Sequence, residues 1–250
     1  MDLKLKGKKA VITGASQGIG KSISKALAKE GVKVFGIART QSLLTTLKDE
    51  IVEEGGEEAI IADIDFLDTK GPQTIYEKAM QSLGDVDILI NNIGRSRAVN
   101  VIGSDEEWQT GMDLDFNRHR QLTEAFLPHF VSKKSGSVLN VTSMYELRSV
   151  NISAVAKASI VAWSKQLSWF LGQHGVRINC LQPGLIDTAN TQRIFTAEAR
   201  KSFSDAEIPL GDFGSPADMA DMATFLVSPR AKYITGSVVV VDGGLSRYPF

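Results

Sequence analysis

Shortages in the composition exclude several classes of protein. The single cysteine, Cys180, cannot form an internal disulfide, so a disulfide-stapled secreted fold is excluded. One cysteine and three scattered histidines give no cluster with the spacing of metal ligands, and we expect no metal site. The longest apolar runs, such as Val238–Val241 and Ile88–Ile90, are far shorter than the ~20 residues that cross a bilayer, so we expect no membrane span.

An excess of charge of one sign is also absent. The 250 residues include 28 Lys and Arg against 29 Asp and Glu, which gives a formal net charge of -1. This balance, with no long block of like charges, argues against a nucleic-acid-binding surface. The segment Met1–Lys9 lacks the apolar core of a secretory signal. Cys180 lies in an apolar stretch, so we interpret it as a core residue of a protein in a reducing compartment. We therefore expect a cytoplasmic protein.

Short runs rich in β-branched residues alternate with longer segments that place apolar residues at three- and four-residue intervals. This alternation is typical of a parallel sheet with crossover helices. The expected strands are Lys9–Thr13, Lys33–Ala38, Ala59–Ala62, Ile88–Ile90, Ser137–Thr142, Arg177–Leu181 and Ser237–Val241. The expected helices are Ser22–Lys29, Leu43–Glu54, Ile75–Leu83, Trp108–Val131 and Ala154–Leu171. Seven such strands predict an α/β fold with a doubly wound, Rossmann-type parallel sheet.

No internal repeat or Pro/Gly/Ser-rich linker interrupts this order, so residues 1–250 are expected to form one domain. The exception to the rhythm is Asp187–Gly214, a long, partly polar stretch with weak helical periodicity. A loop of that length is usually functional, and we interpret residues 187–214 as a substrate loop or lid. Its Ile194, Phe195 and Phe203 favour a small-molecule substrate with an apolar portion.

A glycine-rich turn follows the first expected strand. The segment Thr13–Gly20 reads TGASQGIG and leads directly into a helix. Glycines permit a backbone turn with positive φ and a close approach to a ligand, while the N-terminus of the helix offers free N–H groups to a phosphate. The same three glycines would also suit a tight turn with close helix packing, but the position after the first strand of a βα chain favours a phosphate site.

In this context the segment T-G-x-x-x-G-I-G resembles the signature of the short-chain dehydrogenase/reductase family. Further segments match the family's order over nearly the whole chain: Asn91–Gly94 (where the family has N-N-A-G), Ser143, Lys157, Pro183-Gly184 with Thr188, Tyr233–Gly236 and Asp242–Gly244. The resemblance implies a single NAD(P)-binding domain and an oxidoreductase that is often a homotetramer. We expect a homotetramer or homodimer.

The residue that follows the second strand distinguishes the two dinucleotides. An acid there favours the ribose 2′-hydroxyl of NAD(H), and an arginine favours the 2′-phosphate of NADP(H). The chain has Arg39-Thr40 and no acid, so we infer NADP(H) over NAD(H), although Arg39 could also be a solvated surface charge. The glycine turn and the resemblance together imply these cofactor-binding residues: Gly14, Ser16, Gln17, Gly18, Ile19, Gly20, Arg39, Thr40, Asp63, Ile64, Asn91, Ile93, Gly94, Lys157, Pro183, Gly184, Ile186 and Thr188.

The expected reaction centre departs from the family's pattern. Members that move hydride usually carry an Asn, a Ser, a Tyr, and a Lys four positions after the Tyr, in which the lysine lowers the pKa of the tyrosine phenol. Here Lys157 and Ser143 are present, but Ser153 stands four positions before Lys157 and Asp115 stands where the Asn would fall. A serine hydroxyl is a far weaker acid than a phenol, so Ser153 cannot take over the proton transfer.

Three interpretations of the missing tyrosine stay open. Tyr145, two residues after Ser143, can supply the phenol from the loop; alternatively Asp115 can act as the acid and base, or form only an ion pair with Lys157. In the third interpretation proton transfer has been lost. His119 lies four residues after Asp115 and so on the same helix face, which is consistent either with a catalytic pair or with a packed or solvated histidine.

The leading hypothesis is an NADP(H)-dependent oxidoreductase that interconverts a carbonyl and an alcohol with an atypical proton donor. Its candidate catalytic residues are Ser143, Lys157, Tyr145 and Asp115. The alternative is an NADPH-binding pseudoenzyme that acts as a sensor or scaffold. A cofactor-free lyase or dehalogenase on the same fold is disfavoured because the glycine turn is intact.

Overall fold

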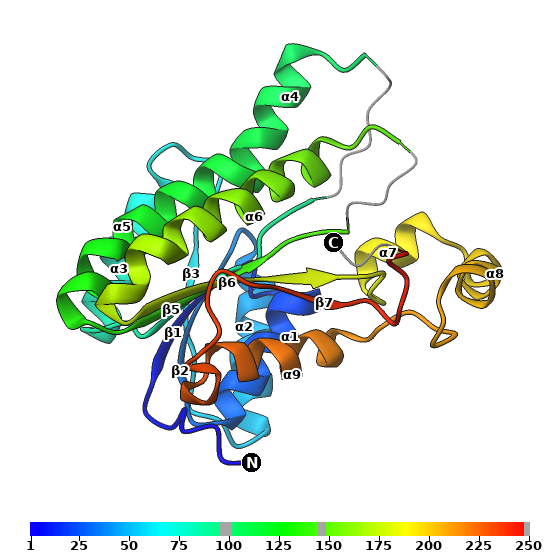
Figure 1. The fold of residues 1–250 in the computed structure, drawn as a ribbon. Coiled ribbons are helices and arrows are strands. Elements are labelled where there is room, and N and C mark those ends of the chain that lie inside the picture. Colours follow the sequence, from blue (N-terminus) through cyan, green and yellow to red (C-terminus); the bar gives the residue numbers. More distant parts are fainter. Residues whose placement is uncertain (96–101, 145–148, 248–250) are drawn as a thin grey trace.

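A seven-stranded parallel sheet forms the centre of the molecule (Figure 1). The computed structural model describes residues 1–95, 102–144 and 149–247. The strands are β1 (Lys9–Thr13), β2 (Lys33–Ala38), β3 (Ile60–Asp63), β4 (Ile88–Asn91), β5 (Gly136–Val141), β6 (Val176–Pro183) and β7 (Val238–Val241). They are ordered β3-β2-β1-β4-β5-β6-β7, which confirms the doubly wound α/β fold expected from the sequence.

The order of the strands reverses beside β1. Strand β1 pairs with β2 on one side and with β4 on the other, so the chain leaves the middle of the sheet in both directions. In open parallel sheets a crevice forms at such a switch point, outside the carboxyl ends of the strands, and ligands bind there. The carboxyl ends of β1, β2 and β4 are followed by Gly14, Arg39 and Asn92 respectively.

Helices cover both faces of the sheet, as Figure 1 shows. The principal helices are α1 (Gly18–Lys29), α2 (Gln41–Glu53), α3 (Gly71–Leu83), α4 (Asp105–Met112), α5 (Arg118–Lys133), α6 (Ile152–Leu171) and α9 (Pro216–Val227). One apolar core lies between the sheet and α1, α2 and α9; a second lies between the sheet and α3, α5 and α6. Short 3₁₀ turns occur at Gly172–His174 and Pro229–Ala231.

The long helix expected over residues 108–131 is interrupted. Helices α4 and α5 are joined without a break by a π-helical turn, Asp113–Asn117. A π turn adds a residue to one helical turn and therefore shifts the faces of the flanking segments, and such turns often occur at functional sites. The side chain of Asp115 within this turn is fully buried.

The segment 187–214 is helical rather than an irregular loop. It contains α7 (Ala189–Ile194) and α8 (Ala197–Glu207), whose N-termini are capped by Thr188 and Thr196. The sequence did not predict these helices, because Ser204 is the only buried residue of α8 and Phe203 is its only large apolar one, which gives a weak helical periodicity.

The environment of the cysteine and the character of the helices can be compared with the expectations from the composition. Cys180 is buried in β6, and burial raises the pKa of its thiol to about 11, so the thiol stays protonated at neutral pH. Within the described ranges, none of the helices combines the length and apolar content that a bilayer crossing requires. No group of three or more His, Cys, Asp or Glu side chains in these ranges is arranged to hold a metal ion.

Candidate functional site

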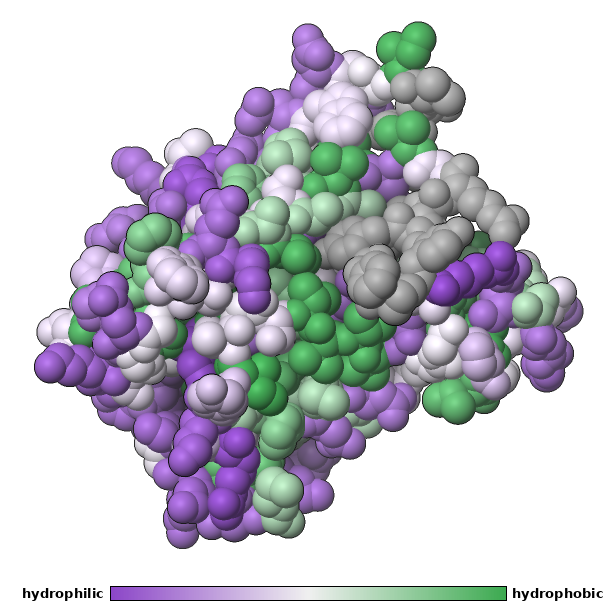
Figure 2. Space-filling view, in the orientation of Figure 1, coloured by the Kyte–Doolittle hydropathy of each residue, from purple (hydrophilic) through white to green (hydrophobic). Residues whose placement is uncertain are grey.

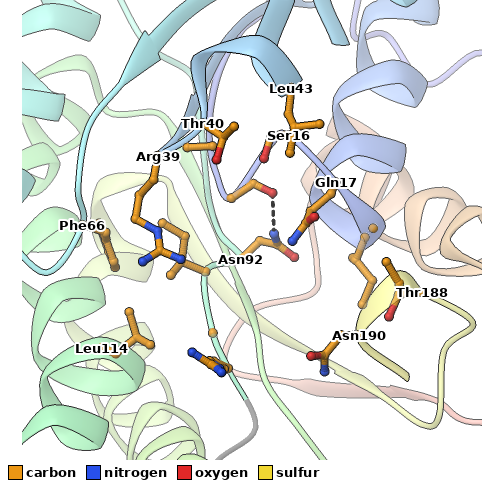
Figure 3. A pocket seen from close by; sticks show the side chains of 18 of the residues that line it. Ser16, Gln17, Arg39, Thr40, Leu43, Phe66, Asn92, Leu114, Thr188 and Asn190 are labelled. Carbon is orange, nitrogen blue, oxygen red and sulfur yellow. Dashed lines mark hydrogen bonds between the residues drawn. The ribbon is translucent and has the colours of Figure 1, made fainter. Parts of the chain in front are cut away.

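A cleft of about 360 Å³ lies at the switch point of the sheet. Its lining residues come from the turn before α1, the end of β2, the loop after β3, the loop after β4, the π-helical turn and the start of α7. They are Gly14, Ser16, Gln17, Gly18, Ile19, Ala38, Arg39, Thr40, Leu43, Asp65, Phe66, Leu67, Asn92, Ile93, Gly94, Arg95, Leu114, Thr188, Ala189 and Asn190. The cleft is long and open, with polar side chains on both walls (Figure 3).

The glycine turn leaves no room for side chains. Gly14 and Gly18 have φ of 66° and 53°, which strongly favours glycine. A Cβ on Gly20 would lie 2.2 Å from the carbonyl oxygen of Gly14, so the first turn of α1 packs directly on the preceding loop. The first N–H groups of an α-helix have no carbonyl partner within the helix, and Gly18 and Ile19 at the start of α1 line the cleft, which makes this position suited to an anion.

Asn92 ties the two halves of the sheet together across the switch point. Its side-chain Nδ2 donates to the carbonyl oxygens of Thr13 at 3.1 Å and Gly14 at 3.2 Å (Figure 3). Its backbone N–H donates to the Thr13 hydroxyl at 3.0 Å. The loop after β4 is therefore fixed against the glycine turn. The sequence motif contained Asn92, but the predicted site residues included its neighbour Asn91 instead.

Arg39 extends into the cleft between Phe66 and Asn92, as Figure 3 shows. Ser16 and Thr40 also line this cleft. Arg39 is exposed, and among the described residues no carboxylate lies within ion-pair distance of its guanidinium. Asp65 also lines the cleft, but its Oδ1 accepts the N–H of Leu67 in its own loop. The guanidinium is thus available to an anionic ligand.

Several predicted cofactor residues lie outside the cleft. Asn91 is fully buried, and its Nδ2 donates to the Thr123 hydroxyl at 2.9 Å and to Asn140 Oδ1 at 2.8 Å. Ile64 belongs to the apolar core, and Asp63 is exposed at the end of β3. The following residues of that loop line the cleft in their place, and sequence spacing alone gave no signal for them.

The predicted residues after β6 have supporting positions. Pro183 pairs with Val241 in the sheet, and a Cβ on Gly184 would lie 2.6 Å from Cα of Asp242. Ile186 is buried and forms a bridge to Gly214. Thr188 reaches the cleft as the N-cap of α7. The cleft is therefore lined by Thr188 but not by Gly20, Pro183, Gly184 or Ile186.

Lys157 lies in a buried polar cluster beneath Ile93 and Gly94. Its Nζ donates to the carbonyl oxygens of Ile93 and Val141, each at 3.0 Å, and lies 3.9 Å from Asp115 Oδ1. A Cβ on Gly94 would come within 2.8 Å of Asp115 Oδ1 and 3.3 Å of Lys157 Nζ. The glycine therefore allows the cleft floor to lie directly on the buried charges.

Burial sets the protonation of this cluster. Burial lowers the pKa of the Lys157 ammonium, and the Asp115 carboxylate opposes this effect. His119 is also fully buried, and its pKa is held well below 6.5 by burial and by the nearby Lys157 ammonium. The structure thus brings Lys157, Asp115 and a neutral His119 together, and the proximity of Asp115 to Lys157 is the arrangement that one of the open interpretations expected.

The remaining predicted catalytic residues lie around the end of β5 and the start of α6. Ser143 is half-buried just beyond β5, and Ser153 is buried in the first turn of α6. Tyr145 lies outside the described residues. Ser153 carries an aliphatic hydroxyl, which is a far weaker acid than a phenol.

Residues 187–214 contain an aromatic cluster of their own. The rings of Phe195, Phe203 and Phe213 meet in edge-to-face pairs with centroids 5.6 to 6.2 Å apart. Arg200 lies over the Phe213 ring and forms an ion pair with Asp187 at 2.8 Å. The three phenylalanines therefore hold α7, α8 and the following turn together.

Comparisons with known proteins agree with this geometry. A family model described as enoyl-(acyl carrier protein) reductase matches residues 14–246. The chain is 32% identical to the 3-oxoacyl-[acyl-carrier-protein] reductase FabG of Vibrio cholerae over 97% of its length and 99% of that protein. The structure of L-sorbose reductase from Gluconobacter frateurii with NADPH and L-sorbose matches with a TM-score of 0.93 and 30% identity, over 99% of this chain and 100% of that one. A 7α-hydroxysteroid dehydrogenase in complex with NADH and 7-oxo glycochenodeoxycholic acid matches with a TM-score of 0.92 and 29% identity, over 97% and 96% of the two chains.

Proposed function

The chain belongs to the short-chain dehydrogenase/reductase family of NAD(P)-dependent oxidoreductases, and we propose that it uses NADP(H) to interconvert a carbonyl and an alcohol. The observation that carries the proposal is the cleft at the switch point, which joins a glycine turn and an exposed Arg39 to the buried Lys157 beneath its floor. A phosphate site at one end and a titratable group beneath the floor are what a dinucleotide-dependent proton and hydride transfer requires.

The residues of the cleft fit a phosphorylated dinucleotide. The glycines let the turn pack closely on Asn92 and Thr188 beside the cleft, and the N–H groups at the start of α1 suit the pyrophosphate. Arg39, which lines the same cleft as the hydroxyls of Ser16 and Thr40, suits the 2′-phosphate that distinguishes NADP(H), because a guanidinium binds phosphate through two parallel hydrogen bonds. When bound, the nicotinamide supplies the hydride for carbonyl reduction and accepts it in alcohol oxidation.

The protein supplies the proton. In the reduction direction a group of the chain gives a proton to the carbonyl oxygen while the carbonyl carbon receives the hydride. Asp115 is fully buried and faces Lys157, so we assign it to holding the ammonium rather than to direct contact with a substrate. Tyr145 remains as the proton donor of the proposal, with Ser143 as a hydrogen-bonding group for the substrate oxygen. The positive charge of Lys157 favours the ionised phenol.

The substrate is proposed to be small and partly apolar. Of the three apolar lid residues singled out in the sequence, Phe195 and Phe203 pack against each other, whereas Ile194 is 61% exposed. Residues 187–214 therefore offer an exposed aliphatic side chain at the end of α7, whose first residues Ala189 and Asn190 line the cleft. The relatives that reduce a sugar and a steroid indicate that this architecture accepts both polar and apolar carbonyl compounds.

We further infer a homotetramer or homodimer. Strand β7 is an edge strand, and its Val238 and Val240 are 39% and 46% exposed. Figure 2 shows apolar side chains gathered around β7 on this face of the molecule. An exposed apolar edge is a surface that a second copy would cover. Light scattering at micromolar concentration tests this, and a monomer would contradict it. We also take residues 1–250 as one domain and, from the reduced Cys180, infer a cytoplasmic location.

The experiment that tests the function follows a labelled hydride. NADPH carrying deuterium at the transferable C4 position is incubated with a panel of carbonyl compounds: L-sorbose, 7-oxo glycochenodeoxycholic acid and a 3-oxoacyl thioester. Mass spectrometry of the product is expected to find one deuterium in at least one alcohol, and not when NADPH is replaced by an equal concentration of deuterated NADH. Tight NADPH binding without transfer to any of a broad carbonyl panel would instead support a cofactor-binding pseudoenzyme.

A further inference from the structure

The first turn of α5 holds two walls of the cleft at once. Arg118 donates from Nε and Nη2 to the carbonyl oxygen of Leu67, at 3.3 and 3.2 Å. The next residue, His119, has its ring 5.0 Å from the ring of Phe66 and its Nε2 2.7 Å from the carbonyl oxygen of Ile93. Phe66 and Leu67 form the wall after β3, and Ile93 forms the floor after β4.

The carbonyl oxygen of Ile93 is shared between His119 and Lys157. Lys157 Nζ donates to it at 3.0 Å while His119 Nε2 lies 2.7 Å from it. Two acceptors do not approach so closely, so His119 Nε2 carries the proton and donates. Nδ1 is then unprotonated, and in the described part of the chain it has no hydrogen-bond partner. Burial and the Lys157 ammonium oppose a second proton on the ring.

We propose that His119 is a positioning residue: as a neutral imidazole protonated on Nε2, it holds the Ile93 carbonyl and through it the ammonium of Lys157. This role rests on the proposed function, because it matters only if Lys157 takes part in proton transfer. The ring contact with Phe66 links the same side chain to the opposite wall. The wall after β3 and the floor after β4 are therefore in contact with the same side chain.

The competing explanation is that His119 only fills space in the core. The two roles depend on different parts of the side chain. His119→Phe keeps an aromatic ring against Phe66 but cannot donate to Ile93, whereas His119→Gln loses the ring but can donate from its amide nitrogen. If packing alone matters, Phe should be the milder substitution; if the hydrogen bond matters, Gln should be.

The first experiment measures the tautomer directly in the protein without substrate. The chain has three histidines, so nitrogen-15 labelling of histidine and long-range proton–nitrogen NMR correlations give few signals. The set that disappears in His119→Gln belongs to His119, and His174→Gln serves as the matched control. The proposal expects the neutral Nε2–H form at pH 7.5. A Nδ1–H tautomer or a charged ring at that pH would overturn it.

The second experiment measures the position of Lys157 and its contribution to kcat. Crystal structures of His119→Phe and His119→Gln are expected to show the Nζ to Ile93 oxygen hydrogen bond lost in the first and kept in the second. With an accepted carbonyl substrate, kcat should fall roughly 10- to 100-fold in His119→Phe, since small misplacements of a catalytic group cost up to that factor. His119→Gln should recover most of kcat, and the Kd of NADPH should stay within about threefold in both.

The outcomes separate the two proposals. A kcat unchanged in His119→Phe, or an intact Lys157 hydrogen bond in its crystal structure, would overturn the positioning role while leaving the oxidoreductase proposal intact. If the wild-type protein transfers no hydride, the proposed function fails, and the tautomer together with the two crystal structures still decides whether His119 holds Lys157 in place.

Discussion

The two ends of the cleft are built in different ways. The proposed phosphate end uses consecutive residues of the glycine turn and the exposed Arg39 at the end of the next strand. The reaction end uses the buried Lys157, Asp115 and His119, which come from α6, the π-helical turn and α5. The first end can bind a ligand by surface complementarity. The second depends on the alignment of three elements around one backbone carbonyl, so substitutions there should affect rate more than binding.

The largest expected effect is on kcat and comes from replacing Tyr145, because this change should alter the rate and leave cofactor binding intact. Tyr145→Phe removes the proposed proton donor, and general acid–base catalysis typically contributes 10²- to 10⁴-fold, so kcat should fall by about that factor. The Kd of NADPH, measured by fluorescence titration, should be unchanged. Tyr233→Phe is the matched control, because the side chain of Tyr233 is fully exposed. A Tyr145→Phe enzyme with wild-type kcat would remove Tyr145 from the mechanism.

The reciprocal experiment removes the guanidinium at the proposed phosphate end and measures cofactor binding. Arg39→Ala should weaken NADPH binding by roughly 10- to 150-fold, because hydrogen bonds to a charged group contribute about 1.5–3 kcal/mol. The Kd of NADH should hardly change, since NADH has no 2′-phosphate. Isothermal titration of both cofactors against both proteins gives the comparison, with Arg230→Ala as an exposed-arginine control. Equal losses for NADH and NADPH would show that Arg39 does not distinguish them.

The difference between the ends also explains what the sequence could predict. The strands β1 and β2 have the bounds expected from their apolar runs, and the glycine turn was evident because its residues are consecutive. Arg39 was identified from its place after β2. By contrast Phe66 and Leu114 reach the cleft through the tertiary fold, and no local spacing marks them.

At the proposed reaction end, Lys157, Asp115 and His119 were candidates from their positions in the chain, but their arrangement was not predicted. The sequence placed Asp115 and His119 on one helix face, and both are buried. The π-helical turn was not predicted, because it depends on packing rather than on residue type. The partner of His119 is a backbone carbonyl, which carries no sequence signal. Helix α9 was also missed, although Ser215 and Asp218 form a capping box before it.

A finer comparison concerns the charge beside Lys157. Asp115 raises the pKa of Lys157 against the effect of burial, so Asp115→Asn should lower that pKa further. The basic limb of the kcat/KM profile should therefore move to lower pH. Asp113→Asn is the control within the same π-helical turn, because the Asp113 carboxylate accepts a hydrogen bond from Asn117 instead. A profile that moves equally in both variants would assign the change to the turn rather than to the ion pair.

The smallest effect is a pH dependence of folding that belongs to the reaction end alone. The fold holds the pKa of His119 well below 6.5, so below pH 6.5 the unfolded chain takes up a proton at this residue that the folded chain does not. The free energy of unfolding should therefore fall with decreasing pH, by about 1.4 kcal/mol per unit from this residue, until the folded pKa is reached. Urea unfolding between pH 5 and 8 measures the slope.

His119→Gln should flatten that slope, whereas His174→Gln, which alters a half-buried histidine far from Lys157 in sequence, should leave it in place. Equal slopes in wild type and His119→Gln would mean that the buried imidazole accepts a proton without cost. That result would contradict the proposal that the His119 ring is neutral and shares the Ile93 carbonyl with Lys157. A charged His119 ring would be repelled by the Lys157 ammonium, whose Nζ lies 3.5 Å from His119 Nε2.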